Sequence, residues 1–141
     1  MPKPDEMLKV IRQWIEKAEE DLRYAKYTLT LTENCPFGTI CFHAQPCAEK
    51  YLKARLVSQG IDFPKVHDVP ELLALIPPSI QPALSAEEQE RLTDYATVTR
   101  YPGDWEPITR EDAEDAEEAV QLARKVRETV RKHIPAVALD G

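Results

Sequence analysis

The chain has 141 residues, of which 43% are hydrophobic and 30% charged, and these proportions are those of one packed globular domain spanning residues 1–141. Its formal net charge of -7 argues against nonspecific DNA binding, because any contact with a polyanion would need a local basic patch. No apolar run reaches the length of a membrane span, and the N-terminus lacks the apolar stretch of a signal peptide. We therefore expect a cytoplasmic protein without membrane contact.

The chain carries no motif of a self-contained metal or nucleotide-hydrolysing enzyme. It lacks a phosphate-binding Gly-rich loop, a G-x-S-x-G turn, an H-E-x-x-H pair and a calcium loop. Its cysteines recur every six residues, at Cys35, Cys41 and Cys47. This spacing matches neither a disulfide framework nor a zinc site, so we expect reduced structural thiols, no metal and no cofactor.

Two long helices are predicted in the N-terminal half. From Asp5 to Leu31, apolar residues recur at spacings of three and four with charged residues between them, which is typical of an amphipathic helix. A second helix is predicted from Phe37 to Gln59, with Gly60 as its C-terminal stop. Alanine and cysteine dominate its apolar side and permit close approach, so it is the expected central helix. Pro46 inside it would remove a backbone hydrogen bond and favour a kink.

Two short helices are predicted next. The first covers residues 68–76, where Asp68 is the N-cap. The second begins at a capping box formed by Ser85 and Glu88 and runs to residues 95–98.

The last predicted helix is long and runs from about Thr109 to Pro135, with acidic residues in its first half and basic residues in its second. With no strand expected, the prediction is an all-α, up-and-down bundle of three long and two short helices.

Several charged residues have both a structural and a functional interpretation. Glu49 and Lys53 form an i,i+4 pair beside Lys50, which is typical of a solvated helix face, and a binding role for the two lysines is the alternative. His43 is better explained as a hydrogen-bonded interior histidine than as a catalytic base. His67 directly precedes Asp68 and is expected either to pack at the start of that helix or to bind.

An aromatic, proline-bearing loop follows the second short helix. Arg100 in this loop would pair with a phosphate, and Tyr101 or Trp105 would stack on a base. The alternative is that Arg100 and Tyr101 only pin the loop onto the bundle.

The one concentrated basic cluster lies at the end of the last helix and comprises Arg124, Lys125, Arg127, Arg131, Lys132 and His133. Compensation of the helix dipole is its simplest explanation. Arg127, however, follows Ala123 in the apolar register, so its guanidinium is predicted to point into a helix–helix or subunit seam, a position that suits anion recognition.

The segment C-F-H-A-Q-P-C-A-E-K-Y-L-K-A from Cys41 to Ala54, the His67-Asp68 pair and the Arg100-Tyr101-Pro102 loop together resemble the HEPN domain family of prokaryotes. The resemblance covers roughly residues 5–134 in the family's order, and Pro46 stands where the family usually has a second glutamine. It implies a five-helix bundle that forms a homodimer and is often encoded beside a minimal nucleotidyltransferase in toxin–antitoxin-like pairs. Nucleotide binding and metal-independent RNA cleavage are the activities it implies.

Two functional interpretations follow from this resemblance. The favoured one is a noncatalytic homodimeric subunit that binds a nucleotide or a partner nucleotidyltransferase through Lys50, Lys53, His67, Arg100 and Tyr101. The alternative is a ribonuclease toxin. Ribonuclease members carry an arginine, four to six residues and a histidine, and the pair Arg127 and His133 has this spacing. Six residues on a helix place the two side chains about 120° apart, so they would need a second subunit to act together. A purely structural adaptor is a third interpretation.

Overall fold

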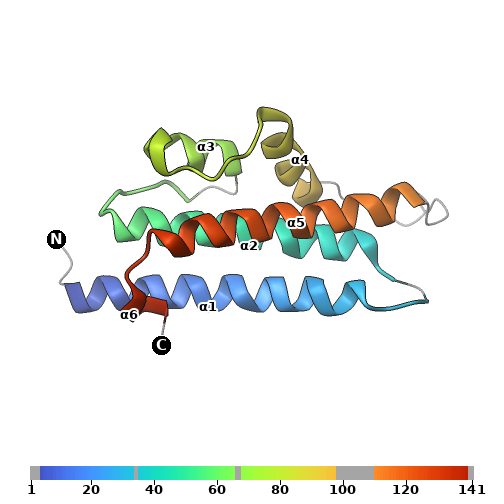
Figure 1. Ribbon diagram of the computed structural model, residues 1–141, viewed down its shortest axis with the longest axis horizontal. Helices are drawn as coiled ribbons and strands as arrows, with labels where there is room; N and C mark the ends of the chain where they lie inside the picture. The colour runs from blue at the N-terminus through green and yellow to red at the C-terminus, as the bar shows by residue number, and fades with distance from the viewer. Residues whose placement is uncertain (1–3, 34, 66–67, 98–109, 140–141) are drawn as a thin grey trace.

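The computed structural model describes residues 4–33, 35–65, 68–97 and 110–139, and every regular element in those ranges is helical (Figure 1). The elements are α1 (Pro4–Leu29), α2 (Phe37–Ser58), α3 (Val69–Ala74), the 3-10 turn η1 (Pro78–Ile80), α4 (Ala86–Thr97), α5 (Arg110–Lys132) and α6 (Ala136–Leu139). The all-α prediction of three long and two shorter helices is confirmed, and η1 and α6 are additions to it. Among the described residues, no helix is both long enough and apolar enough to cross a lipid bilayer.

The three long helices lie side by side, and α3 and α4 cover one side of this layer (Figure 1). Helix α1 runs opposite to α2 and α5, because the residues of α3 and α4 carry the chain back to the end where α2 began (Figure 1). Helix α2 contacts α1, α3, α4 and α5, which makes it the central helix, as predicted. Its buried positions are Ile40, Cys41, Ala44, Gln45, Cys47, Ala48, Glu49, Tyr51, Leu52, Lys53, Ala54 and Leu56.

Small side chains let the neighbouring helices approach α2 closely. Ala44, Ala48 and Ala54 are fully buried in it, and Ala18 and Ala25 are fully buried on α1. The three cysteines are free and buried, which confirms their prediction as structural thiols. Burial raises the pKa of the Cys47 thiol well above its ordinary value, so this sulfur is held in its neutral form.

Pro46 does not end the central helix, which continues from Phe37 to Ser58. A proline has no N–H, so the carbonyl of Phe42 loses its helical donor. Phe42 is exposed and Pro46 is partly exposed, so the proline lies on a side of α2 that other helices do not fully cover.

Gly60 forms the C-terminal stop of α2, as predicted, two residues after the helix ends at Ser58. Gly60 has a positive φ of 67°, and the N–H of Ile61 donates to the carbonyl of Leu56 while the N–H of Gly60 donates to that of Val57. This pair of hydrogen bonds is the Schellman motif, whose left-handed residue is normally glycine. The Ser85 and Glu88 capping box at the start of α4 is also present, because each side chain accepts from the other's backbone N–H.

Replacing Gly60 with alanine is expected to destabilise the protein by about 1 kcal/mol. The space beside Gly60 is open, so a methyl group meets no neighbour and only the left-handed backbone is penalised. Chemical unfolding of the two proteins measures this difference. The assignment of Gly60 as a backbone-required helix stop would be wrong if the alanine variant were as stable as the wild type.

Candidate functional site: a groove between α1 and α5

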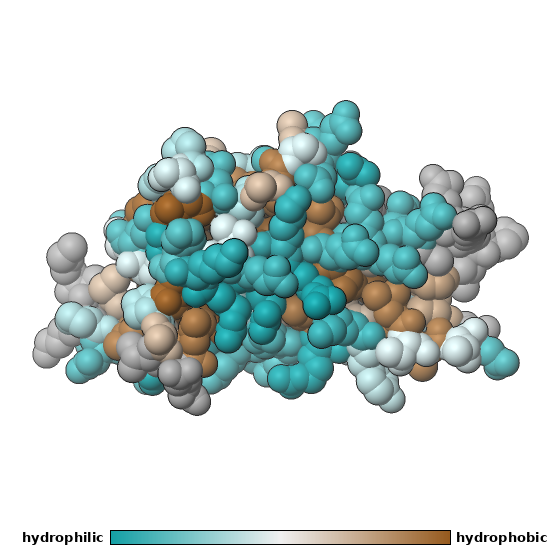
Figure 2. Space-filling view, viewed as in Figure 1, coloured by the Kyte–Doolittle hydropathy of each residue, from teal (hydrophilic) through white to brown (hydrophobic). Residues whose placement is uncertain are grey.

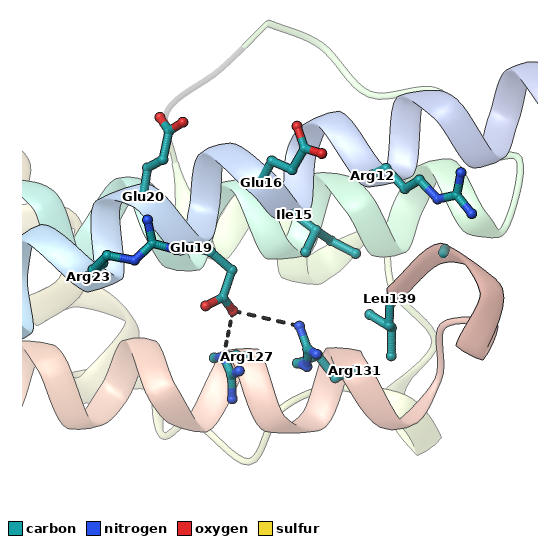
Figure 3. Close-up of a pocket in the computed structure, with 10 residues that line it drawn as sticks. Arg12, Ile15, Glu16, Glu19, Glu20, Arg23, Arg127, Arg131 and Leu139 are labelled. Carbon is teal, nitrogen blue, oxygen red and sulfur yellow. Dashed lines mark hydrogen bonds and ion pairs between the residues drawn. The ribbon is translucent and has the colours of Figure 1, made fainter. Parts of the chain in front are cut away.

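An open groove of about 430 Å³ lies between α1 and α5, with α6 at one end (Figure 3). It is lined by Arg12, Ile15, Glu16, Glu19, Glu20, Arg23, Arg127, Arg131, Ala138 and Leu139. Figure 2 shows hydrophilic side chains over the middle of this side of the molecule, with hydrophobic ones nearer its ends. The groove is therefore a polar feature with a small apolar wall from α6.

Helical spacing brings these side chains together. On α1, Arg12, Glu16, Glu19 and Arg23 are three or four residues apart, so they lie along one side of the helix beside its buried stripe. On α5, Arg127 and Arg131 are four residues apart and face them (Figure 3). Two rows of charged side chains from helices distant in sequence thus line opposite walls of one groove.

Glu19 is the centre of a hydrogen-bonded network in this groove. Its Oε1 accepts from Nε of Arg127 at 2.6 Å and from the hydroxyl of Tyr51 on α2, and it forms an ion pair with Nη1 of Arg131 at 3.7 Å. Nη1 of Arg131 also donates to the Tyr51 hydroxyl at 3.4 Å. Two hydrogen-bond donors and a second guanidinium, from two helices, therefore meet at one carboxylate oxygen.

The network shifts the protonation of its members. Burial acts to raise the pKa of Glu19, but the hydrogen bonds from Tyr51 and Arg127 and the charges of Arg127 and Arg131 outweigh it, and the pKa lies below its ordinary value. Burial raises the pKa of the Tyr51 phenol well above its ordinary value, and the hydrogen bond to Glu19 raises it further. Glu19 is consequently an anion and Tyr51 a neutral donor at neutral pH.

The lowered pKa of Glu19 predicts a pH dependence of stability. Because folding lowers this pKa below 4.5, the ion pairs of Glu19 stabilise fully above pH 4.5, and the stabilisation is lost as the pH falls through the lower folded value. We expect the wild type to be more stable than Glu19→Gln near neutral pH, with the difference shrinking in acid. Urea unfolding of both proteins across this range measures it, and a difference that stays constant with pH would contradict the assignment.

The groove is locally more basic than the molecule as a whole. Four arginines line it, Arg12, Arg23, Arg127 and Arg131, against the three glutamates Glu16, Glu19 and Glu20, which leaves a formal charge of +1. The whole chain carries -7. Arg127 points into the seam between two helices, as its register predicts. The α1–α5 groove is thus lined by more arginines than glutamates, although the net charge of the chain is negative.

A second polar cluster lies where α1 meets α2 on another side of α1. Nδ1 of His43 lies 3.0 Å from Oδ1 of Asp21, and Nζ of Lys50 donates to Oδ2 of Asp21 at 2.5 Å. The ring of His43 packs against that of Tyr24 at 4.2 Å between centroids. His43 is therefore hydrogen-bonded, as predicted, but half-buried. Lys50 is held by a carboxylate of the same molecule.

The prediction that Glu49 and Lys53 lie on a solvated helix face is wrong. Glu49 is 4% exposed and Lys53 is 6% exposed. Nζ of Lys53 donates to Oε1 of Glu49 at 2.6 Å and lies over the ring of Trp14, while Nε2 of Gln45 donates to Oε2 of Glu49 at 3.2 Å. An i,i+4 pair of opposite charge has the same spacing on a buried face as on a solvated one, and α2 is covered on several sides.

The predicted pair Arg127 and His133 is not joined in the described structure. His133 is exposed, one residue beyond the end of α5, and its carbonyl accepts from Nη1 of Arg55 at 2.5 Å. Among the described residues, no hydrogen bond joins it to Arg127, whose guanidinium is held by Glu19. His67, Arg100 and Tyr101, like Trp105, lie outside the described residues. In the part of the chain that is described, no group of three or more side chains is arranged to hold a metal ion.

Comparison with known proteins identifies the class of this bundle. A model of the HEPN domain family matches residues 11–133, most of the chain. The chain therefore belongs to the HEPN domain family, which confirms the resemblance carried by the central-helix segment.

Relatives with this fold include archaeal and bacterial proteins. A Methanocaldococcus jannaschii protein named "Putative toxin MJ1304" is 31% identical over an alignment 137 residues long, and the match covers 88% of this chain and 88% of that one. The crystal structure of TT1696 from Thermus thermophilus is similar with a TM-score of 0.67 and 30% identity, covering 86% of this chain and 96% of that one. The structure of ST0689, described as an archaeal HEPN homologue, is similar in fold with a TM-score of 0.59 and 24% identity, covering 89% of this chain and 98% of that one.

Proposed function

We propose that this chain is a noncatalytic HEPN subunit that acts as a homodimer with a minimal nucleotidyltransferase in a toxin–antitoxin-like pair. In this proposal its α1–α5 groove binds a phosphate-bearing ligand, either a nucleotide or RNA. The observation that carries the ligand class is that four arginines line one open groove of a chain whose net charge is -7. The toxin name of the archaeal relative supports the biological setting.

Arginine is the side chain best suited to this ligand. Its planar guanidinium stays charged and donates parallel hydrogen bonds to phosphate oxygens. The groove volume of about 430 Å³ lies within the usual range of small-molecule sites. Arg12 and Arg23 line the α1 side of this space, and Arg127 and Arg131 line its α5 side (Figure 3). A phosphate in the groove would thus have donors on two sides.

Binding of two probes tests the proposal. The probes are a nucleoside triphosphate and a short single-stranded RNA, each with chelator present, so that the two sources of phosphate are distinguished. The variant is Arg23→Ala, which removes an exposed arginine of the groove, and its matched control is Arg124→Ala, an exposed arginine of α5 outside the groove. We expect Arg23→Ala to weaken binding about fivefold and the control to leave it nearly unchanged.

If wild type, Arg23→Ala and Arg124→Ala bound the probes equally well, the groove would not be the ligand site. Light scattering on the same samples tests the homodimer, and co-purification with a nucleotidyltransferase encoded beside the gene tests the partner. A monomer that binds neither probe nor partner would contradict the whole proposal.

A metal-independent ribonuclease that uses Arg127 and His133 is the second candidate. The exposure of His133 at the end of α5 favours it, because the imidazole is open to a substrate or to a second subunit. In such an enzyme His133 would move the proton of the 2′-hydroxyl, and Arg127 would stabilise the charge of the phosphorane. Because His133 lies beyond the end of α5 and Arg127 is held by Glu19, a second subunit would have to complete the site.

RNA cleavage with chelator present separates the two candidates. Wild type is compared with His133→Ala, a change of an exposed side chain that is expected to leave the fold intact. Cleavage that disappears in His133→Ala would establish the ribonuclease. A well-folded dimer that binds RNA without cutting it would leave the binding subunit as the function.

A further inference from the structure

We propose that the carboxylate of Glu19 occupies the place that a ligand phosphate takes in the α1–α5 groove, so that binding requires the phosphate to displace Glu19 from Arg127 and Arg131. This inference rests on the proposed function. It adds that the Glu19 carboxylate competes with the ligand phosphate for Arg127 and Arg131. Glu19 would then set the affinity of the groove instead of contributing to binding.

The hydrogen bonds of Glu19 are those that a phosphate oxygen would accept. A single oxygen, Oε1, receives Nε of Arg127, the hydroxyl of Tyr51 and the charge of Arg131. Carboxylate and phosphate oxygens are both anionic acceptors that guanidinium groups bind in the same fork geometry. The donors that hold Glu19 therefore form a site for an anionic oxygen, which the protein fills from its own chain.

The Glu19 network is open to a ligand. The side chains of Glu19, Arg127 and Arg131 are 28%, 32% and 30% exposed, and all three line the groove. In Figure 3 the Glu19 side chain reaches from α1 toward Arg127 and Arg131 on the facing helix. A ligand in the groove thus meets these guanidinium groups from the open side without unfolding the bundle.

The displaced carboxylate has another partner nearby. Arg23 lies four residues after Glu19 on α1 and lines the same groove. A glutamate four residues before a basic residue is a favourable helical pair. A basic side chain on its own helix therefore lies within reach of Glu19 when a phosphate displaces it from Arg127 and Arg131.

If Glu19 competes with the ligand, neutralising it should raise the affinity more than neutralising another glutamate of the groove. Neutralising any glutamate of the groove removes some repulsion of a phosphate, but only Glu19 holds Arg127. Removing the charge of Glu19 also weakens the internal contact that the ligand must break. The gain in affinity from Glu19→Gln should consequently exceed that from Glu16→Gln, which removes the same charge from the same groove.

The test compares binding of the nucleoside triphosphate and the single-stranded RNA to wild type, Glu19→Gln and the matched control Glu16→Gln. Glutamine keeps the size of glutamate, and thermal unfolding verifies that each variant is folded. We expect Glu19→Gln to bind at least about fivefold more tightly than Glu16→Gln. A second variant, Tyr51→Phe, removes a donor that Glu19 and the entering phosphate share, so its affinity should change less than that of Glu19→Gln.

A spectroscopic readout follows the displacement itself. The carbon that bears the Tyr51 hydroxyl, labelled with carbon-13 and assigned by its loss in Tyr51→Phe, reports the hydrogen bond to Glu19. We expect saturating ligand to shift this resonance in wild type, because Glu19 leaves the hydroxyl.

The outcomes separate this inference from the proposed function. Equal gains in Glu19→Gln and Glu16→Gln, weaker binding by Glu19→Gln, or an unmoved Tyr51 resonance would overturn the competitor role while leaving the groove as the ligand site. Absence of binding by wild type and by every variant would overturn the proposed function and this inference together.

Discussion

Replacing Lys53 with methionine is expected to lower the free energy of unfolding by about 3 kcal/mol. The change leaves the carboxylate of Glu49 buried, at 4% exposure, without the ammonium that lies 2.6 Å from it. Gln45 still donates to the other oxygen of Glu49, which places the expected loss at the lower end for a broken buried ion pair. Urea unfolding of the purified variant measures it.

Two further variants make this prediction specific. Lys50→Met breaks a partly exposed pair whose carboxylate, Asp21, keeps His43 as a partner, so its expected cost is below about 1 kcal/mol. Replacing both Glu49 and Lys53 with apolar residues should be less destabilising than Lys53→Met alone, because no charge of this pair then remains buried. A cost of Lys53→Met no larger than that of Lys50→Met would mean that Lys53 is not buried with Glu49.

The second large effect is expected for Arg127→Leu in the α1–α5 groove. The leucine removes the guanidinium that donates to Glu19 at 2.6 Å and that is proposed to receive the ligand phosphate. We expect binding of the nucleoside triphosphate and of RNA to weaken by more than about tenfold, and stability to fall by about 1–2 kcal/mol. Binding titrations and urea unfolding of the same preparation measure the two effects.

The control for Arg127→Leu is Arg124→Leu, which removes an exposed arginine three residues earlier on α5. We expect this control to bind both probes within about twofold of the wild type, because surface charges outside the contact act weakly at ordinary ionic strength. If both leucine variants lost affinity equally, the ligand would be held by the general charge of α5 and not by the groove.

The helices and most of the core could be predicted from local patterns. The apolar residues Ile11, Ile15, Ala18, Leu22 and Ala25 recur with helical period on α1, and all of them are buried. This works because a helix on the surface of a bundle buries one stripe and exposes the rest. Helix α6 was missed because four residues after a proline are too few to show a period.

The central helix could be identified by its small residues, but the environment of its charges could not. Glu49 and Lys53 have the spacing of a solvated pair, and only the packing of other helices around α2 makes them buried. A helix that is covered on several sides has no continuous polar face, and the scatter of polar residues around α2 was the signal available. Whether Glu49 and Lys53 are solvated or buried therefore depends on tertiary packing, which their spacing does not reveal.

The lining of the groove also depends on tertiary packing that local sequence patterns do not reveal. The orientation of Arg127 could be predicted because the position continues an apolar stripe of its own helix. Its partner Glu19 lies 108 residues earlier in the chain, and its identity depends on the axial offset between α1 and α5. That offset is set by side-chain packing along the whole contact, which no single motif records. Arg12 and Arg23 were missed for the same reason.

The claim that the α1–α5 groove receives a phosphate-bearing ligand is tested most directly by NMR of arginine side chains. The Nε–Hε resonances, assigned by single substitutions, are followed while the nucleoside triphosphate or the RNA is added. The account predicts that Arg12, Arg23, Arg127 and Arg131 shift together, while Arg55 and Arg91, which lie outside the groove, stay in place. Ligand binding that moves other arginines and leaves these four unchanged would contradict it.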